Sequence, residues 1–400
     1  MEKSDFLLIG GGIIGISIAR ELKKRYPDSS ICILEKELEC GLHASGRNSG
    51  VLHAGFYYTA DSFKAKFTRD GNKKLTEYCD FKKIKVNKCG KLVVAQNESE
   101  LTWLDELLIR AKNNGVPLES ITEEESKTIE PRAKTFQRAL FSPSTSSVNP
   151  KDLLKAMQLD AIQEGVQIRT DAQYLHRKDK NIILTSNGLF EAGYLINVAG
   201  LYADKIGRDF GFSKDYRILP FKGLYLYSNE PSGSLRTHIY PVPDLANPFL
   251  GVHLTVTTDG KVKLGPTAIP AFWREQYEGW SNFRFDELTE ILLRQAGLFL
   301  SSNFDFKALA IRELQKYSRP KMVSLASSLA KGVDIKNYRK WGEPGIRAQL
   351  LNIREKKLEM DFVLEGDNRS MHILNAVSPG FTCALPFAEY VCDQIGSKLS

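Results

Sequence analysis

Three glycines near the start of the chain, and an acid about 20 residues after the last of them, have the spacing of a dinucleotide-binding turn. Gly10, Gly12 and Gly15 form G-x-G-x-x-G, and Glu35 ends the next apolar segment. Gly10 permits a tight turn, Gly12 lets a pyrophosphate approach the backbone, and Gly15 lets the following helix pack closely. The start of that helix attracts phosphates, and the acid suits a ribose hydroxyl. The alternative is a glycine-rich turn in an ordinary βαβ unit. The motif predicts a dinucleotide without distinguishing NAD, NADP and FAD.

A second group of chemically useful residues lies at 44–55, where small residues alternate with one arginine, one asparagine and one histidine. Small residues let a backbone wrap closely around a flat ring system. Asn48 and Ser49 offer hydrogen bonds to ring or phosphate oxygens. His53 is a candidate acid or base, because imidazole titrates near pH ~6.5. A histidine packed beside a cofactor without proton chemistry is an equally good interpretation.

These residues need strands and helices to position them. Apolar segments at 6–9 and 31–34 predict buried parallel strands around the first glycine turn. A further strand at 194–198 opens into Ala199-Gly200, and the chain returns through 378–382 into an apolar helix at 384–395. Other expected helices are 62–79, 98–113, 151–164 and 280–304. Other expected strands are 89–95, 165–169, 182–185, 223–227, 249–255, 261–264, 360–364 and 371–374.

Length and composition indicate a soluble, globular protein. The 400 residues suffice for two to three domain-sized units, 42% are hydrophobic, and the net charge is +7. No nucleic-acid motif is present, and the six cysteines lack zinc-site spacing, so we expect no metal and no nucleic-acid partner. No apolar run reaches the roughly 18 residues of a spanning helix. With no room for a leader before the first strand, we expect a cytoplasmic protein; contact with the inner face of a membrane stays open.

The chain resembles the FAD-dependent D-amino-acid-oxidase-like superfamily in its first glycine turn, in Ser45-Gly-Arg-Asn-Ser-Gly-Val-Leu-His53-Ala-Gly, and in Asn197-Val-Ala-Gly-Leu-Tyr-Ala-Asp204. Within it, the chain is similar to the L-2-hydroxyglutarate dehydrogenase/oxidase branch. The supporting segments are Cys89-Gly-Lys-Leu-Val-Val-Ala95, His238-Ile-Tyr-Pro-Val-Pro-Asp244, Pro248-Phe-Leu-Gly-Val-His253-Leu-Thr255 and Gly345-Ile-Arg347-Ala-Gln.

This resemblance implies an α/β plus α+β flavoprotein with a Rossmann-type FAD-binding domain built from discontinuous segments, and a substrate domain with a mostly antiparallel sheet. We expect the FAD domain at 1–75, 146–212 and 340–400, and the substrate domain at 76–145 and 213–339. The residues expected to bind FAD are Gly10, Gly12, Ile13, Ile14, Gly15, Glu35, Lys36, Ser45, Arg47, Asn48, Ser49, Gly50, Val51, Ala199, Gly200, Pro379, Gly380, Phe381 and Thr382.

The implied reaction is oxidation of a small L-2-hydroxy acid, most simply L-2-hydroxyglutarate to 2-oxoglutarate, with hydride transfer to flavin N5. The expected catalytic residues are His53, His253, Arg347, Tyr240 and Lys222. Arg347, in an expected loop, suits a carboxylate because of its bidentate fork, although a structural salt bridge is the alternative. His253 could instead be a core histidine, Tyr240 a packing aromatic, and Lys222 a solvated lysine at a strand edge.

Departures from the branch leave the substrate open. Lys222 replaces a common arginine, Val256 a basic residue and Thr267 an asparagine, and the last turn reads Asn375-Ala-Val-Ser. The alternatives are an amine oxidase of the same fold, acting on glycine or a D-amino acid, and a non-catalytic flavin-binding subunit. The electron acceptor, oxygen or a membrane quinone, and self-association also stay open.

Overall fold

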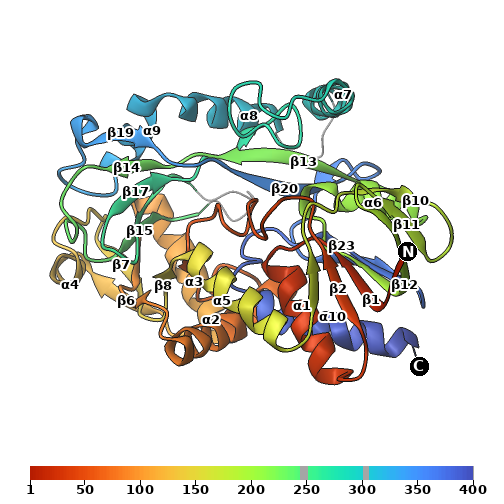
Figure 1. Cartoon of the computed structure of the whole chain (residues 1–400). Coiled ribbons are helices and arrows are strands. Elements are labelled where there is room, and N and C mark those ends of the chain that lie inside the picture. Colours follow the sequence, from red (N-terminus) through yellow and green to blue (C-terminus); the bar gives the residue numbers. More distant parts are fainter. Residues whose placement is uncertain (244–250, 301–305, 400) are drawn as a thin grey trace. The chain divides into compact units, whose positions relative to one another are not determined.

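The computed structural model describes residues 1–243, 251–300 and 306–399, and the chain divides into two compact units (Figure 1). Unit 1 consists of Met1–Asn48, Pro150–Pro220 and Arg347–Ser400. Unit 2 consists of Ser49–Asn149 and Phe221–Ile346. Each unit is therefore assembled from segments that are far apart in the sequence.

Unit 1 is built on one mixed sheet whose centre is parallel. The order β10-β11-β12-β1-β2-β9 is joined by β23, which runs parallel to β12 and pairs with β22. β1 lies between β12 and β2 and is parallel to both, and its buried end is continuously apolar. The strands are β1 (Glu2–Ile9), β2 (Ile31–Leu34), β9 (Gln167–Arg169), β10 (Tyr174–Arg177), β11 (Ile182–Thr185), β12 (Gly188–Asn197), β22 (Val363–Gly366) and β23 (Ser370–Asn375).

Helix α1 (Ile13–Arg25) packs against α10 (Ala384–Leu399) and α5 (Pro150–Gln163) (Figure 1). Its buried side contains Ile16 and Leu22, and its last turn carries three basic residues that suit the negative end of the helix dipole. The short helices η2 (Gly200–Tyr202) and α6 (Ala203–Asp209) follow β12. The N- and C-terminal segments thus complete one core together.

Unit 2 contains an eight-stranded sheet in the order β19-β14-β17-β16-β15-β5-β7-β6. Within it β5 and β15 are parallel, and all the other neighbouring strands of this order are antiparallel. The strands are β5 (Lys91–Val94), β6 (Glu119–Thr122), β7 (Arg138–Ser142), β14 (Leu226–Ser228), β15 (His238–Pro241), β16 (His253–Val256), β17 (Val262–Gly265) and β19 (Tyr338–Trp341). A smaller sheet is formed by β3 (Val51–Leu52), β8 (Ser146–Val148) and β4 (Val86–Asn87).

One face of the eight-stranded sheet is an apolar core. Leu92, Ile239, Leu254 and Leu264 pack there together with Met322 of α9. The helices of unit 2 are α2 (Phe63–Lys82), α3 (Leu101–Asn114), α4 (Glu123–Ile129), α7 (Phe285–Leu300), α8 (Phe306–Leu314) and α9 (Arg319–Ser327), with 3-10 turns at Glu98–Glu100, Gln315–Tyr317 and Ile335–Asn337. Because side chains alternate along each strand, the residues between these apolar ones must face the other way.

Two strands contain the points at which the chain passes between the units. They are β13 (Tyr216–Gly223) and β20 (Gly345–Asn352), which belong to a four-stranded sheet with β18 (Ile269–Pro270) and β21 (Lys357–Leu358). Across the residues described above, no helix is long and apolar enough to cross a membrane.

Several expected boundaries need correction. Residues 49–75, expected in the FAD domain, lie in unit 2, because β3 pairs with β8 and α2 packs against α3 there. The expected strand 223–227 is interrupted, since the Thr267 hydroxyl accepts the Leu224 N–H at 3.0 Å and removes it from the ladder. The expected helix 280–304 begins only at Phe285, after Asn282 at a φ of 52°. Residues 244–250 and 301–305, including parts of two quoted segments, lie outside the described residues.

Candidate active site and cofactor-binding segments

The first glycine turn leaves no room for side chains. A Cβ added to Gly15 would lie 2.1 Å from the Gly10 carbonyl oxygen, and one on Gly10, at a φ of +122°, would lie 2.5 Å from the Val198 oxygen. Helix α1 begins directly after Gly12, which provides no side-chain cap. The turn therefore brings strand, helix and the 197–200 segment as close together as a dinucleotide-binding fold requires.

Glu35 and Ser45 hold this turn from the side. Glu35 is buried, and its Oε2 accepts the Gly11 N–H at 2.8 Å. The Ser45 hydroxyl accepts the Ile13 N–H at 3.0 Å, so it supplies the cap that glycine cannot. Both side chains thus lie where the first turn of α1 begins.

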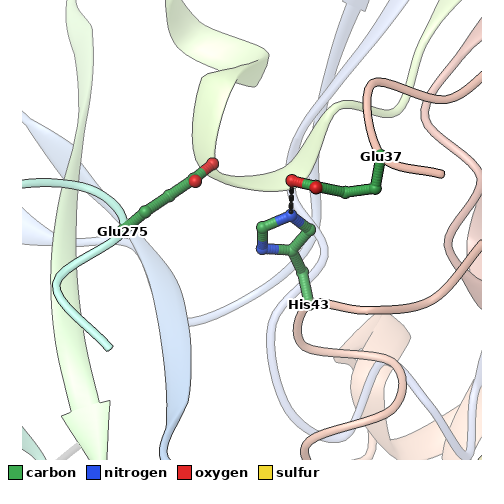
Figure 2. A group of neighbouring side chains, drawn as sticks. All are labelled: Glu37, His43 and Glu275. Atoms are coloured by element: carbon green, nitrogen blue, oxygen red, sulfur yellow. Dashed lines mark hydrogen bonds and ion pairs between the residues drawn. The ribbon is translucent and has the colours of Figure 1, made fainter. Parts of the chain in front are cut away.

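The loop at 36–48 is braced by its own polar residues. Figure 2 shows the Glu37 carboxylate against His43, whose Nε2 lies 2.9 Å from Oε1; Lys36 also pairs with Glu37. Arg47 Nε donates to the Leu42 carbonyl at 2.6 Å, and Asn48 Nδ2 donates to the Ser45 carbonyl at 2.7 Å. These contacts give Lys36, Arg47 and Asn48 a role in shaping the loop, whatever else they bind.

The other two turns expected at the cofactor differ in the space they leave, because a Cβ on Gly200 would meet nothing within 4 Å whereas one on Gly380 would not fit. The Asn197 Oδ1 accepts the Ala199 N–H at 3.2 Å, and Gly200 follows at a φ of +53°. A Cβ on Gly380 would lie 2.4 Å from the Ala376 oxygen. The Gly380 N–H donates to Val377, while Thr382 is buried just before α10. These residues all belong to unit 1; Ser49, Gly50 and Val51 belong to unit 2.

The face of the unit 2 sheet opposite its apolar core carries a buried row of ionisable and aromatic groups. Strand alternation and register place there Lys91 on β5, His238 and Tyr240 on β15, His253 and Thr255 on β16, and Lys263 on β17. We call these six residues the polar face. In the part of the chain that the structure describes, the only acid on a strand of this sheet is Glu119, which lies on the other face.

Lys91 is the most unusual member of the polar face. Its side chain is fully buried, and its Nζ lies 4.6, 4.5 and 4.8 Å from the ring centroids of Phe56, Tyr57 and Tyr240. Among the described residues, this Nζ has no hydrogen-bond partner, and the hydroxyls of Tyr57, Tyr240 and Thr255 have none either. Buried polar groups are normally hydrogen-bonded, so the cluster lacks a component.

His253 and His238 are held in different ways. The His253 ring stacks on Tyr240 with centroids 3.6 Å apart, and its Nδ1 donates to the Gly251 carbonyl at 2.9 Å. A carbonyl only accepts, so the neutral ring keeps its lone pair on Nε2. His238 has the opposite tautomer, because its Nδ1 accepts the Val256 N–H at 3.0 Å. His253 is therefore the better proton acceptor.

The polar face favours uncharged bases. Burial lowers the pKa of His238 and of His253 to about 3, and the nearby lysines add to the effect. Burial, with Lys91 and the other two histidines, also holds the pKa of His53 well below its usual range. Burial lowers the pKa of Lys91 to about 7 and that of Lys263 to about 8. At neutral pH the histidines are therefore uncharged, and Lys91 and Lys263 are the members of the face that can take up a proton when negative charge arrives.

We expect Lys91→Met to raise the melting temperature of the substrate-free protein by several degrees at pH 7. Lys91 has a pKa of about 7 when folded and ~10.4 when unfolded. Between these values the unfolded chain binds the extra proton, so wild-type stability falls as the pH drops from about 10 to about 7. The gain from the substitution should shrink towards pH 10. Thermal melts at pH 7 and pH 10 test this, with exposed Lys261→Met as control; equal melting of Lys91→Met and wild type at pH 7 would contradict it.

The structure brings together His253 and Tyr240, and the effect of His253 on His53 places that residue near them. Lys222 is buried on β13 in the same unit, and burial lowers its pKa, so the interpretation as a solvated edge lysine was wrong. Arg347 lies on β20 and not in a loop, because β20 continues the strand alternation through buried Ile346. It belongs to unit 1, whereas the other four belong to unit 2.

Lys91, Tyr57, His238 and Lys263 were missed as site residues. The sequence did contain an indication for Lys91, because this lysine begins a strand whose other residues are Leu, Val and Val. Lysine in such a strand has to be buried or at an edge. What the sequence did not reveal is the register that sets Lys91 beside His238.

Comparison with known proteins decides the family. Residues 5–394 match the family model described as FAD dependent oxidoreductase. The chain belongs to this family. FAD is accordingly its cofactor, as expected. L-2-hydroxyglutarate dehydrogenase of Escherichia coli K12 is 35% identical, over 99% of this chain and 94% of its own. The human mitochondrial L-2-hydroxyglutarate dehydrogenase is 34% identical, over 98% of this chain and 89% of its own.

Solved structures of two oxidases support the fold. An L-α-glycerophosphate oxidase of Mycoplasma pneumoniae with FAD bound has a TM-score of 0.78 at 22% identity, over 99% of this chain and 95% of its own. A glycine oxidase of Geobacillus kaustophilus has a TM-score of 0.73 at 19% identity, over 100% and 96%. The mixed α/β architecture with a mostly antiparallel second sheet is thus confirmed.

The residues of unit 1 fit the cofactor. The turn at Gly10 and Gly15 has no room for a Cβ, which suits close approach of the pyrophosphate. The N–H groups at the start of α1 would bind the pyrophosphate. Glu35 would serve the ribose, and Ser45 fixes the turn. Gly380 and the following backbone would approach the flavin ring, where negative charge develops on reduction.

Proposed function

We propose that this protein oxidises a small L-2-hydroxy dicarboxylate, L-2-hydroxyglutarate, to 2-oxoglutarate. The observation that carries the proposal is the polar face, with two lysines and three nearby histidines and no acid from the sheet among the described residues. Such a site suits a substrate with two negative charges. An amino-acid substrate would instead bring an ammonium group beside two lysines, with no described acid of this face of the sheet to pair with it. The two full-length relatives that are dehydrogenases of this hydroxy acid point the same way.

Bound FAD would supply the acceptor for the hydride from the substrate α-carbon. The residues of this chain have three tasks. His253 Nε2 takes the proton of the 2-hydroxyl group, with Nδ1 fixed by Gly251. Tyr240 holds the His253 ring in place by stacking. Arg347 and Lys222 remain our candidates for binding a carboxylate and for stabilising negative charge.

The histidine at position 53 is the second candidate base. Its backbone is held by Asn72, whose Nδ2 donates to the carbonyls of Leu52 at 3.0 Å and His53 at 3.2 Å. Its pKa is held low by burial, so it is neutral at physiological pH. We assign the proton transfer to His253 because the hydrogen bond of its Nδ1 defines the lone pair on Nε2.

Anaerobic mixing of the FAD-loaded protein with L-2-hydroxyglutarate, D-lactate, glycine and sarcosine tests the function. We expect bleaching of the flavin absorbance by L-2-hydroxyglutarate, because only this compound combines the L-2-hydroxyl group with two carboxylates. Bleaching by glycine or sarcosine alone would overturn the proposal in favour of an amine oxidase. If none of the four bleaches the flavin, the protein is not an oxidase of this substrate class.

A further inference from the structure

The polar face has donors without acceptors. Lys91 Nζ and the hydroxyls of Tyr57, Tyr240 and Thr255 are buried, and none of these four groups has a hydrogen-bond partner within the described residues. An amine and three hydroxyls can be satisfied together by a group that only accepts hydrogen bonds, and an ionised carboxylate has two such oxygens. The aromatic rings around Nζ stabilise a cation but supply no strong acceptor.

Charge leads to the same conclusion. The groups that face Lys91 from neighbouring strands and loops are the bases His53, His238 and His253 and the phenols Tyr57 and Tyr240. Lys263, further along the face, interacts with Asp259, which lies exposed in the β16–β17 turn and bonds to Thr257. Lys316 also acts on His253 but is paired with Glu313. Among the described residues of these elements, no acid therefore neutralises the inner part of the cluster.

We propose that Lys91 Nζ is the receptor for one carboxylate of the substrate, and that it takes up a proton when the carboxylate binds. In the empty site an ammonium would be buried without a counter-ion, which is expensive, so the neutral amine is favoured. A carboxylate supplies the missing charge and acceptor, and the resulting ion pair carries a charge-assisted hydrogen bond. The proton comes from solvent and forms an N–H bond with Lys91 Nζ, and no other bond forms or breaks. This inference rests on the proposed function for the identity of the substrate.

Isothermal titration of the FAD-loaded protein with glutarate tests the proposal. Glutarate has both carboxylates but no hydroxyl, so it cannot be oxidised at the α-carbon. Titrations at pH 8 in phosphate and in Tris, which differ in ionisation enthalpy, count the protons exchanged. We expect uptake of about one proton per site at pH 8, falling to about half a proton at pH 7, because the pKa of Lys91 in the free protein is about 7.

Variants attribute the proton to Lys91. In Lys91→Met we expect the uptake at pH 8 to vanish and the Kd for glutarate to rise by at least about 10-fold, as when one partner of a buried ion pair is removed. Lys261→Met removes an exposed lysine that directly precedes β17 and is not part of the polar face, and it should match the wild type. Methionine is close to lysine in length and suits an aromatic cage, so FAD content and melting temperature should show a folded protein.

The titration and bleaching experiments test the role of Lys91 and the oxidation of L-2-hydroxyglutarate separately. Equal heats in the two buffers for the wild type, or unchanged glutarate affinity in Lys91→Met, would overturn the role of Lys91 even if L-2-hydroxyglutarate bleaches the flavin. Proton-linked glutarate binding without bleaching would support the anion receptor and overturn the oxidation instead. The wild-type titrations need no variant, so the proposal stays testable if Lys91→Met fails to fold.

Discussion

Replacing His253 by asparagine is expected to slow anaerobic reduction of the flavin by L-2-hydroxyglutarate by roughly 10²- to 10⁴-fold, the usual contribution of a positioned general base. Asparagine keeps an N–H donor near the position of Nδ1, which bonds to the Gly251 carbonyl at 2.9 Å. It removes Nε2, the atom that accepts the proton in our mechanism. Stopped-flow absorbance of the FAD-loaded variant measures the effect.

The control for this variant is His176→Asn, which changes an exposed histidine of β10 in unit 1. L-2-hydroxyglutarate should reduce the flavin of this variant at the wild-type rate. FAD content should be unchanged in both variants, because neither histidine is among the residues expected to bind FAD. If the flavin of His253→Asn is reduced at the wild-type rate, His253 is excluded as the base and His53 becomes the candidate. Loss of FAD from His253→Asn would show that the residue is structural.

Gly15→Ala is expected to abolish FAD binding and to lower the stability of the protein by at least about 3 kcal/mol, the upper end of ordinary overpacking. The new methyl group would lie 2.1 Å from the Gly10 carbonyl oxygen and 3.1 Å from a Val198 methyl. The nearest atom is backbone, so the strand and the helix must separate, and the turn that we expect to bind the pyrophosphate is lost with them. The ratio of flavin to protein absorbance and the melting temperature report the two effects.

Gly396→Ala is the matched control. It also adds a methyl group to a glycine in a helix of unit 1, where the nearest atom, the Tyr26 hydroxyl oxygen, is at an ordinary 3.6 Å. This variant should retain FAD and be no less stable than the wild type, because alanine favours helix. A Gly15→Ala protein that is as yellow and as stable as Gly396→Ala would contradict the steric argument.

The local features of unit 1 were predictable because short-range physics determines them. Ile31–Leu34 and Ile182–Thr185 have the expected bounds, since each is a short apolar segment between polar residues. Gly10 and Gly15 occupy the close approach that their spacing predicts. Glu35 meets the same turn through the Gly11 N–H. Such contacts follow from a motif that lies within a few tens of residues.

The polar face was only partly predictable. His253 and Tyr240 were identified through resemblance, but Lys91 became visible only when the register placed it beside His238, 147 positions further along the chain. Likewise, residues 49–75 joined unit 2 because Val51–Leu52 pairs with β8, a contact between segments almost 100 residues apart. Pairing at this distance depends on the whole fold and leaves little trace in local sequence patterns.

The discontinuity of unit 1 determines the order in which a ribosome can complete the protein. β12 receives its neighbour β23, and α1 its neighbour α10, only when the last segment has been made. At 5–20 residues per second, α1 waits roughly 20–70 s for that helix. Unit 2 has all its segments by Ile346 and can fold earlier. The first helix synthesised is thus among the last to be fully covered, because α5 can pack against it early but α10 is missing throughout that interval.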